Sequence, residues 1–353
     1  MIEREDLANL SLPVYFNEPL SMLQRIAEIM ENEYLLVQAN GQADSLRRMA
    51  YVSVFNAAQF NSIVDRKLKP FNAILGETYE YITDEYKFFG EQVDYRVSAC
   101  YAESGSYEMH FDTSLTSHFW AQSLSFKPSG QISITLKKYK EYYIIDRPNV
   151  NAQNIVFGKP YLDCSGTSTA INMRTNEKCV LNFHGKGWSE SSYGLLDGFI
   201  FNAAGERVIE IKGKWSKSIW ITDLRTGKTE MLWRRNPELK NWEDYYCFTK
   251  FAMQLNNLPE KLRNYIPLTD SRLRPDLRAL ENGDIKLASE EKFRLEELQR
   301  TSRKYREENN IEYKPKYFTE QIDEVTKEKS YVFNRRYWDD RKSQNWLHLP
   351  KIY

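Results

Sequence analysis

The sequence predicts a β-rich (α+β) fold, in which a large antiparallel β-barrel follows N-terminal helices and precedes a C-terminal helical region. Alternation of apolar and polar residues dominates residues 71–220, which is the pattern of half-buried strands. Turn signals recur between the alternating runs, and helical patterns replace the alternation at both ends. Many short strands with regular turns suit a barrel, and a barrel of this size can enclose a cavity.

The alternation is clearest in three runs. Their apolar positions, each separated by one polar or outward-facing residue, are Ile132, Ile134 and Leu136, then Cys179, Leu181 and Phe183, then Ile209 and Ile211. Glycine or asparagine turns separate such runs, at Ser129-Gly130, Thr175-Asn176 and Ala204-Gly205. The spacing therefore predicts antiparallel hairpins.

Three other segments carry helical patterns. Residues 18–39 predict a helix with Asn17 as its cap and Pro19 in its first turn. A second helix is expected from Asp44 onward, with apolar residues such as Met49 on one side. Residues 284–309 are heavily charged and lack Gly and Pro, which predicts a long, largely solvated helix.

Composition narrows the function classes. Lys+Arg and Asp+Glu both number 49, so the formal net charge is zero, which argues against a general nucleic-acid binder. The four cysteines have no zinc-site spacing, and we expect them to be reduced in a cytosolic protein. No apolar run reaches the ~18 residues of a membrane-spanning helix, and the N-terminus lacks a signal-peptide core. We therefore expect a soluble, cytoplasmic chain.

A series of ordered motifs points to one family. They are residues 69–77 (KPFNAILGE), 154–158, 232–237, 270–276 (DSRLRPD) and 291–297. In this order they resemble the lipid-binding and lipid-transfer domain of the oxysterol-binding-protein-related family over roughly residues 12–340. The resemblance implies a barrel around a lipid tunnel, covered by an N-terminal lid. It also implies a cytoplasmic monomer that touches membranes transiently and carries one lipid, which is a sterol, phosphatidylserine or phosphatidylinositol 4-phosphate.

The resemblance also suggests how residues 1–353 are organised as a single domain. We expect a short lid at 1–16, a helical segment at 17–66, the barrel at 67–255 and a C-terminal helical subdomain at 256–353. Family lids are often longer than this one, and a short lid leaves part of a bound lipid wet at ~25 cal/mol per Å².

Five residues are candidate ligands of a lipid headgroup. Lys69 and Asn72 match the family's headgroup strand, and an ammonium and an amide suit phosphate oxygens. Lys292, Glu296 and Arg300 follow i, i+4, i+8 spacing, so they share roughly one helix face, and Glu296 is expected to hold Arg300. The alternatives are a surface lysine with a turn asparagine, and a solvated helix whose ion pairs contribute only ~0.2–0.5 kcal/mol each.

The chain departs from the family at its EQVSHHPP signature. Glu91-Gln92-Val93 is retained, but Asp94-Tyr95-Arg96 follows, and both histidines are absent. In the family these histidines contact the inositol 4-phosphate. Two lost hydrogen bonds to a charged group weaken binding by roughly 10²–10⁴-fold. Arg96 is the candidate replacement, because a guanidinium binds phosphate through two parallel hydrogen bonds. Asp94 opposes it, so the resemblance predicts weakened or altered phosphoinositide recognition.

The tunnel candidates are Gln59, Phe60 and Leu12. Gln59-Phe60 matches a Gln-Tyr pair that lies near the sterol hydroxyl in some family members, and Gln59 can bind a hydroxyl directly or through water. The alternative for Gln59 is a helix amide that faces solvent. Leu12, with Leu7 and Leu10, supplies apolar groups near the lid.

Two other functions compete with lipid transfer. An enzyme is disfavoured, because the sequence has no GxSxG, P-loop or HExxH motif and its four histidines show no metal-ligand spacing. We accordingly expect no catalytic residue, metal or cofactor. A lipid-regulated sensor or interaction protein with little transfer activity is the second rival, and the missing histidines favour it. The sequence leaves the choice of lipid open.

Overall fold

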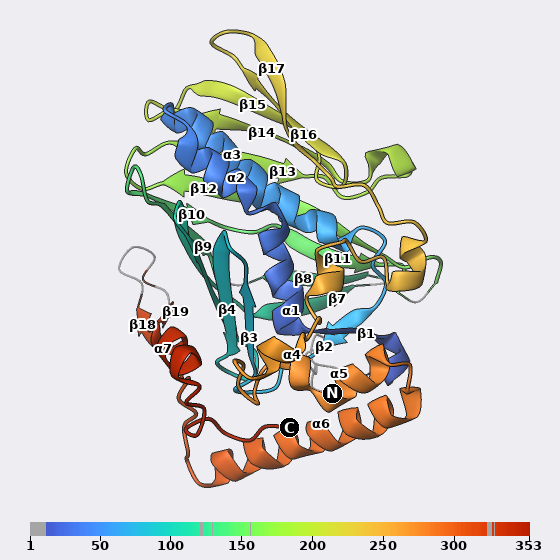
Figure 1. Cartoon of the computed structure of the whole chain (residues 1–353). Coiled ribbons are helices and arrows are strands. Elements are labelled where there is room, and N and C mark those ends of the chain that lie inside the picture. Colours follow the sequence, from blue (N-terminus) through green and yellow to red (C-terminus); the bar gives the residue numbers. More distant parts are fainter. Residues whose placement is uncertain (1–11, 121–122, 129, 156, 323–326, 328) are drawn as a thin grey trace. The chain divides into compact units, whose positions relative to one another are not determined.

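The computed structural model describes residues 12–120, 123–128, 130–155, 157–322, 327 and 329–353 (Figure 1). Its described residues fall into two compact units. The first unit contains Glu28–Lys67 and Ala102–Lys250, and the second contains 12–27, Leu68–Tyr101 and Phe251–Tyr353.

The first unit is built on an antiparallel sheet of hairpin-connected strands. Its neighbouring strands follow the order β17-β16-β15-β14-β13-β12-β10-β9-β6, with β11 beside β12 and β8, and β7 beside β8. The bounds are β6 (Tyr107–Thr113), β7 (Leu115–Trp120), β8 (Ser123–Pro128), β9 (Ile132–Leu136), β10 (Glu141–Ile145), β11 (Asn149–Gln153), β12 (Tyr161–Asn172), β13 (Lys178–Phe183), β14 (Leu195–Phe201), β15 (Arg207–Lys214), β16 (Ser218–Asp223) and β17 (Lys228–Arg234). The alternation predicted for β9, β13 and β15 is confirmed, because their apolar positions are the buried ones.

The long strand β12 changes partner along its length. Its beginning pairs with β11, where Ser165 lies opposite Asn149, and its end pairs with β10, where Asn172 lies opposite Tyr143. Gly166 stands at the change and has a φ of +99°, which a residue without a Cβ adopts at little cost. This glycine lets one strand serve two partners.

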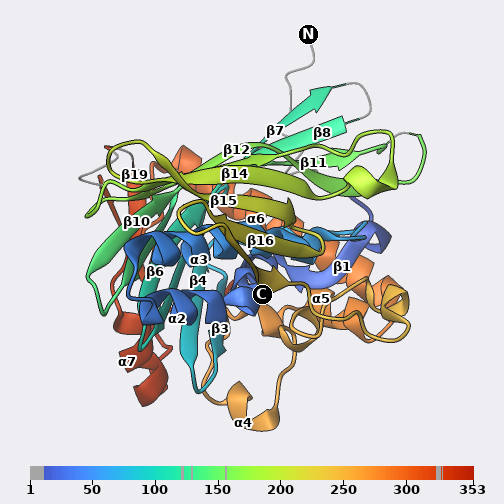
Figure 2. The same cartoon turned by 90° about the horizontal axis from the view of Figure 1, so that it is seen from above.

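Helices cover one face of this sheet. They are η3 (Glu28–Asn32), α2 (Tyr34–Gly41), α3 (Ser45–Ala58) and η4 (Gln59–Ile63). Figures 1 and 2 show α2 and α3 lying across the strands of this unit, and α3 packs on β12–β15 and β17. The helix predicted from Asp44 is confirmed: the Asp44 side chain accepts a hydrogen bond from Leu46 N at 2.9 Å, and Met49 is fully buried.

The second unit combines short strands with most of the C-terminal helices. Its elements are η2 (Val14–Phe16), β1 (Asn17–Ser21), α1 (Met22–Ala27), β2 (Lys69–Phe71), β3 (Thr78–Ile82), β4 (Tyr86–Gln92), the start of β5 (Ser98–Ser104), η7 (Ala252–Gln254), α4 (Glu260–Arg263), η8 (Ser271–Leu273), α5 (Pro275–Glu281), α6 (Ile285–Glu308), β18 (Phe318–Ile322), β19 (Lys329–Phe333) and α7 (Arg336–Ser343). The strands β3, β4 and β5 are neighbours, β18 pairs with β19, and β1 pairs in parallel with β2.

Aromatic rings form a buried core cluster in this unit. The Phe89 ring of β4 lies 4.0 Å from the Tyr337 ring and 5.4 Å from the rings of Tyr317 and Phe333, measured between centroids. All four side chains are buried. The C-terminal segment is thus fixed to β4 by aromatic packing, which contributes beyond simple area burial.

One helix prediction is wrong at its start. The sequence predicted one helix over residues 18–39 with Asn17 as cap, but Asn17–Ser21 is a strand, and α1, η3 and α2 follow as separate elements from Met22 onward. The Asn17 amide donates to the carbonyl oxygens of Lys69 (3.1 Å) and Pro70 (3.3 Å) instead of capping a helix. A contact with a distant strand therefore overrides the local signal. The long helix predicted over 284–309 is confirmed as α6, capped by Asp284.

Candidate functional site

The first motif, residues 69–77, forms β2 and a tight irregular turn. Lys69 is half-buried and lies opposite Asn17 in the parallel β1–β2 pair, and Asn72 follows directly after the strand. Gly76 has a φ of +84°, and its N–H donates to Gln92 O at 2.9 Å. A Cβ at Gly76 would lie 3.0 Å from the Tyr313 hydroxyl, so the turn favours glycine for both conformation and space.

The last residue of that motif, Glu77, is fully buried, and its carboxylate stabilises the turn through hydrogen bonds. Its carboxylate accepts from Ile74 N (3.0 Å), from Ser271 Oγ (2.6 Å) and from the Arg274 guanidinium (2.8 Å). Arg274 also donates to Asn72 O at 2.7 Å and pairs with Asp276 at 2.8 Å. Burial alone would lower the pKa of Arg274, but Asp276 and Glu77 together raise it. The motif at 270–276 therefore positions the backbone that carries Lys69 and Asn72.

The predicted trio on α6 is partly joined by contacts. Lys292 is buried, and its Nζ donates to Leu12 O (2.7 Å) and to Glu296 Oε1 (2.8 Å). Arg300 is exposed and pairs with Glu297. Lys292 and Glu296 thus form an ion pair at i, i+4 spacing, whereas Arg300 forms its ion pair with Glu297 at i, i+3 spacing.

Arg96 lies in the turn that replaces the histidine pair. The turn joins β4 to β5 and is closed by hydrogen bonds between Asp94 and Val97, with N···O distances of 3.2 and 3.3 Å. The Asp94 carboxylate accepts from Arg96 N at 3.2 Å, and the Arg96 side chain is exposed. Tyr95 of the same turn contacts Arg303 and Arg306 of α6.

All six candidate headgroup residues belong to the second unit. Phe71 of β2 shares a buried apolar cluster with Ala288 of α6, one turn before Lys292, and this packing places β2 beside the start of α6. Tyr95 attaches the Arg96 turn near the other end of the same helix. The structure therefore arranges the candidates along α6, and their role in binding stays a prediction.

The tunnel candidates Gln59 and Phe60 lie in η4 of the first unit. Gln59 is half-buried, and its amide nitrogen donates to the backbone and side-chain oxygens of Asn56, both at 2.8 Å. Asn56 donates to Ser168 Oγ at 2.7 Å, so Gln59 ends a buried polar chain. Phe60 is buried and packs edge-on against Phe183, 5.5 Å between ring centroids. Gln59 is thus an anchored amide, and its contact with a lipid hydroxyl stays a prediction.

Leu12 is the first described residue and is half-buried; its carbonyl oxygen accepts the Lys292 bond. Most of the expected lid at 1–16, including Leu7 and Leu10, lies outside the described residues. The segment boundaries expected from the sequence also stay predictions.

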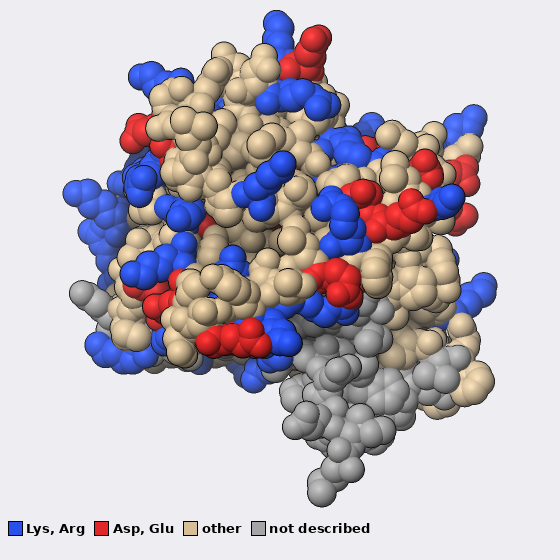
Figure 3. Space-filling view, turned by 90° about the horizontal axis from the view of Figure 1, so that it is seen from below, with Lys and Arg blue, Asp and Glu red and all other residues tan. Residues whose placement is uncertain are grey.

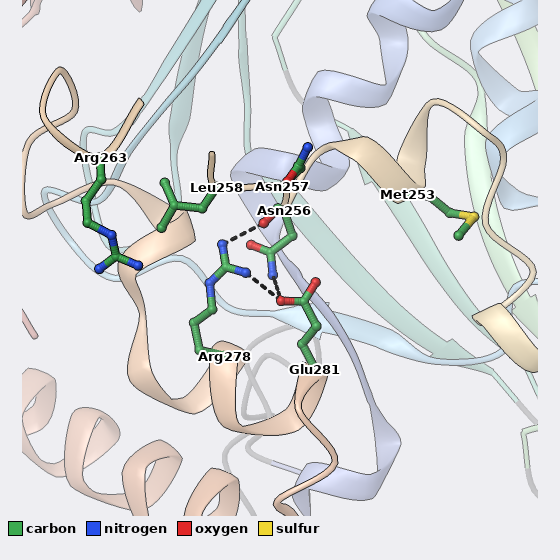
Figure 4. Close-up of a pocket in the computed structure, with 7 residues that line it drawn as sticks. All are labelled: Met253, Asn256, Asn257, Leu258, Arg263, Arg278 and Glu281. Atoms are coloured by element: carbon green, nitrogen blue, oxygen red, sulfur yellow. Dashed lines mark hydrogen bonds and ion pairs between the residues drawn. The ribbon is translucent and has the colours of Figure 1, made fainter. Parts of the chain in front are cut away.

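A separate pocket of about 430 Å³ opens in the second unit, between the segment after η7 and α5 (Figure 4). The Arg278 guanidinium donates to Asn256 O and to Glu281 Oε2, both at 2.6 Å, and Asn256 Nδ2 donates to the same Glu281 oxygen at 2.9 Å. These polar groups satisfy one another, and none of the candidate residues lines the pocket. We therefore interpret its polar wall as structural.

On the face of the molecule seen in Figure 3, surface charge is mixed rather than gathered in one field. Seen from below, Lys and Arg side chains are interspersed with Asp and Glu (Figure 3). Recognition of an anionic group then depends on individual cations rather than on a broad positive field. Sequence reasoning did not predict the contacts of Arg274, Tyr95 and Arg306. Of the three, only Arg274 had a signal in the sequence, in the alternating charges of the motif at 270–276.

Comparison with known proteins identifies the family. The family model described as "Oxysterol-binding protein" matches residues 3–342. The chain belongs to the oxysterol-binding protein family. Human oxysterol-binding protein-related protein 6 is 37% identical over 344 residues, which cover 96% of this chain and 36% of that protein. Oxysterol-binding protein homolog 1 of Saccharomyces cerevisiae is 34% identical over 384 residues, covering 99% and 32%. The chain thus spans about a third of the length of these curated relatives.

Solved structures of this family have the same fold. The Osh1 ORD domain in complex with cholesterol is 34% identical, with a TM-score of 0.93 over 99% of this chain and 88% of that chain. The Osh3 ORD of Saccharomyces cerevisiae in complex with PI(4)P is 28% identical, with a TM-score of 0.86 over 99% and 92%. The β-rich fold predicted from the oxysterol-binding-protein-related motifs is therefore confirmed.

None of the helices among the described residues combines the length and the apolar character that a membrane crossing requires.

Proposed function

We propose that this member of the oxysterol-binding protein family is a lipid-binding and lipid-transfer protein that carries one lipid between membranes. The observation that carries the proposal is the retained group of Lys69, Asn72, Lys292, Glu296 and Arg300 within one unit. Two structural neighbours at 34% identity hold cholesterol or ergosterol, and one at 28% holds PI(4)P. We further propose a cytoplasmic monomer that contacts membranes at their surface.

The proposed headgroup ligands are Lys69 and Asn72 from β2 and its turn, with Lys292, Glu296 and Arg300 from α6. The Lys292 ammonium donates to Leu12 O and to Glu296, which fixes it in place. A fixed cation loses less conformational entropy on binding phosphate than a mobile one does. Lys69 and Arg300 then supply the more accessible charges.

The test is lipid transfer between vesicles. Donor phosphatidylcholine vesicles would carry a labelled sterol, phosphatidylserine or phosphatidylinositol 4-phosphate, and unlabelled vesicles would accept it. We expect transfer of at least one lipid, and a loss of roughly 10-fold or more for anionic lipids in Lys69→Met, since one charge-assisted hydrogen bond is lost. Lys286→Met is the matched control, because Lys286 is a highly exposed lysine of α6.

A lipid-regulated sensor is the second candidate function, favoured by the turn that replaces the family's histidines. It predicts stable binding of a lipid without its delivery to acceptor vesicles. Absence of transfer for all three lipids, with an intact fold and lipid still bound, would replace the transfer proposal with this one.

We also propose that phosphoinositide recognition is altered at Arg96. The Arg96→Ala variant is expected to extract less phosphatidylinositol 4-phosphate than the wild type while sterol uptake stays unchanged. Unchanged phosphoinositide extraction by this variant would remove Arg96 from the site.

A further inference from the structure

Two arginines near the end of α6 meet one tyrosine from the turn at residues 94–97. The Arg306 Nη1 donates to the Tyr95 hydroxyl at 3.2 Å, and the Arg303 Cζ lies 5.0 Å from the centre of the Tyr95 ring. Residues three apart on a helix are neighbours on its surface. Tyr95 therefore brings the guanidinium groups of Arg303 and Arg306 close together. Neither arginine belongs to the sequence motifs at residues 69–77 and 291–297.

Arg306 is unusual among the arginines of α6 in its surroundings. Arg294, Arg300 and Arg303 each pair with a glutamate of the same helix. Arg306 is half-buried, and among the described residues it has no carboxylate partner; its other contact is the Tyr313 ring, 5.6 Å from its Cζ. A partly desolvated charge without a counter-ion is costly, and an arriving anion would offset that cost.

A second unsatisfied group lies on the same side of the helix. The side-chain oxygen of Gln299 (Oε1) is buried and accepts no hydrogen bond from the described residues. Gln299 precedes Arg303 by four residues and Arg306 by seven, so the three share one face. An acceptor beside two guanidinium groups suits a ligand that carries both hydroxyl and phosphate groups.

Among Arg300, Arg303 and Arg306, the first two already have carboxylate partners. Arg300 pairs with Glu297 and Arg303 with Glu307. The Asp94 carboxylate is engaged by Arg96 N, and that of Glu307 by Arg303. Arg306 is the member of this group that a new anion would pair with first.

We propose that Tyr95, Arg303 and Arg306 form a phosphate subsite one helical turn beyond Arg300, which takes a phosphate group of an anionic lipid headgroup. The step from Arg300 to Arg303 is about 4.5 Å along the axis at 1.5 Å per residue, so the subsite continues the row of headgroup candidates. Two guanidinium groups bind phosphate through charge-assisted hydrogen bonds, and the Tyr95 hydroxyl orients one of them. The proposal rests on the proposed lipid-binding function.

The test compares Arg306→Met with Arg294→Met in the full chain. Arg294 is on the same helix, nine residues before Arg303 and so on the opposite face, and its pairing with Glu291 is exposed. Binding is measured by flotation with phosphatidylcholine vesicles that contain either phosphatidylinositol 4-phosphate or phosphatidylinositol. We expect binding to the phosphorylated lipid to weaken on the order of 10- to 100-fold in Arg306→Met, and by much less in Arg294→Met.

Further variants separate loss of the subsite from loss of the fold. Arg306→Lys keeps a cation and should recover part of the binding, whereas Tyr95→Phe keeps the ring and should lose a smaller share. Sterol uptake should be unchanged in all of them. If Arg306→Met binds the phosphorylated lipid as Arg294→Met does, the subsite is excluded.

Three further outcomes have distinct meanings. Titration with inorganic phosphate and with soluble inositol bisphosphate tests the source of the anion. If Arg306→Met loses as much affinity for inorganic phosphate as it loses for the vesicles, a subsite for a lipid headgroup is excluded. A wild-type protein that carries sterol or phosphatidylserine but shows no preference for the phosphorylated lipid would overturn the subsite and leave the proposed function standing. A wild-type protein that binds no lipid at all would overturn both.

Discussion

Arg274 shows how a charged side chain becomes part of the core. Its guanidinium is almost wholly buried, as are the carboxylates of Glu77 and Asp276 that it pairs with at 2.8 Å. Buried ion pairs contribute little net stability, but removing one partner leaves the other charge uncompensated. Arg274 also donates to Asn72 O, so the same side chain supports the turn that carries a headgroup candidate.

Arg274→Met is therefore expected to destabilise the protein by about 3–5 kcal/mol, because two buried carboxylates lose their common cation. Arg294→Met, which breaks an exposed pair with Glu291, is expected to change the unfolding free energy by less than ~1 kcal/mol. Urea unfolding followed by circular dichroism measures both. A loss in Arg274→Met as small as the one expected for Arg294→Met would show that the buried network is not needed for stability.

Helix α3 depends on its first turn as well as on its buried sides. The Asp44 side chain caps the helix through Leu46 N, and its other carboxylate oxygen pairs with Arg225 at 2.8 Å. Arg48, in the first turn, pairs with Glu141 of β10 at 2.6 Å, and both are buried. The start of α3 is thus held both by its cap and by the sheet beneath it.

Asp44→Ala should cost about 0.5–2 kcal/mol, since Leu46 N loses its acceptor. Asp44→Asn keeps a capping oxygen and removes only the charge that faces Arg225, so its cost is expected to be smaller. Thermal unfolding midpoints of the two variants make the comparison. A midpoint for Asp44→Asn as low as that of Asp44→Ala would assign the effect to the ion pair rather than to the cap.

Elements with local signals were the ones that sequence reasoning placed correctly. The helix starts near Asp44 and Asp284 and the alternation in β9 depend on a few neighbouring residues, so the sequence alone predicts them. The strand β1 was missed because Asn17 bonds to Lys69 O, which is 52 positions away. The Tyr95–Arg306 contact joins residues 211 positions apart, and no spacing rule reaches that far.

At the scale of the whole molecule, buried groups whose pKa differs between the folded and unfolded chain set the pH dependence of stability. Glu91 is one such group: its carboxylate accepts from Lys316 N (2.8 Å) and Tyr317 N (2.9 Å). Burial raises the pKa of Glu91 from 4.5 to about 7, although these hydrogen bonds lower it in part. Burial likewise raises the pKa of Glu18 to about 7, partly offset by Arg25.

These raised values fix the sign of the pH effect. The native state binds the Glu91 proton more tightly than the unfolded chain does, so the associated stability is complete below about pH 4.5 and is lost as the pH rises through about 7. A shift of this size corresponds to roughly 3 kcal/mol at ~1.4 kcal/mol per pKa unit.

Glu91→Gln has no such proton to lose. The unfolding free energy of the wild type minus that of Glu91→Gln should therefore fall between about pH 5 and pH 8. Urea titrations across that range measure the difference, and Glu18→Gln serves as the matched comparison for the second carboxyl. Parallel pH profiles for the wild type and Glu91→Gln would mean that the Glu91 carboxylate is ionised in the folded protein, held by its two backbone N–H donors.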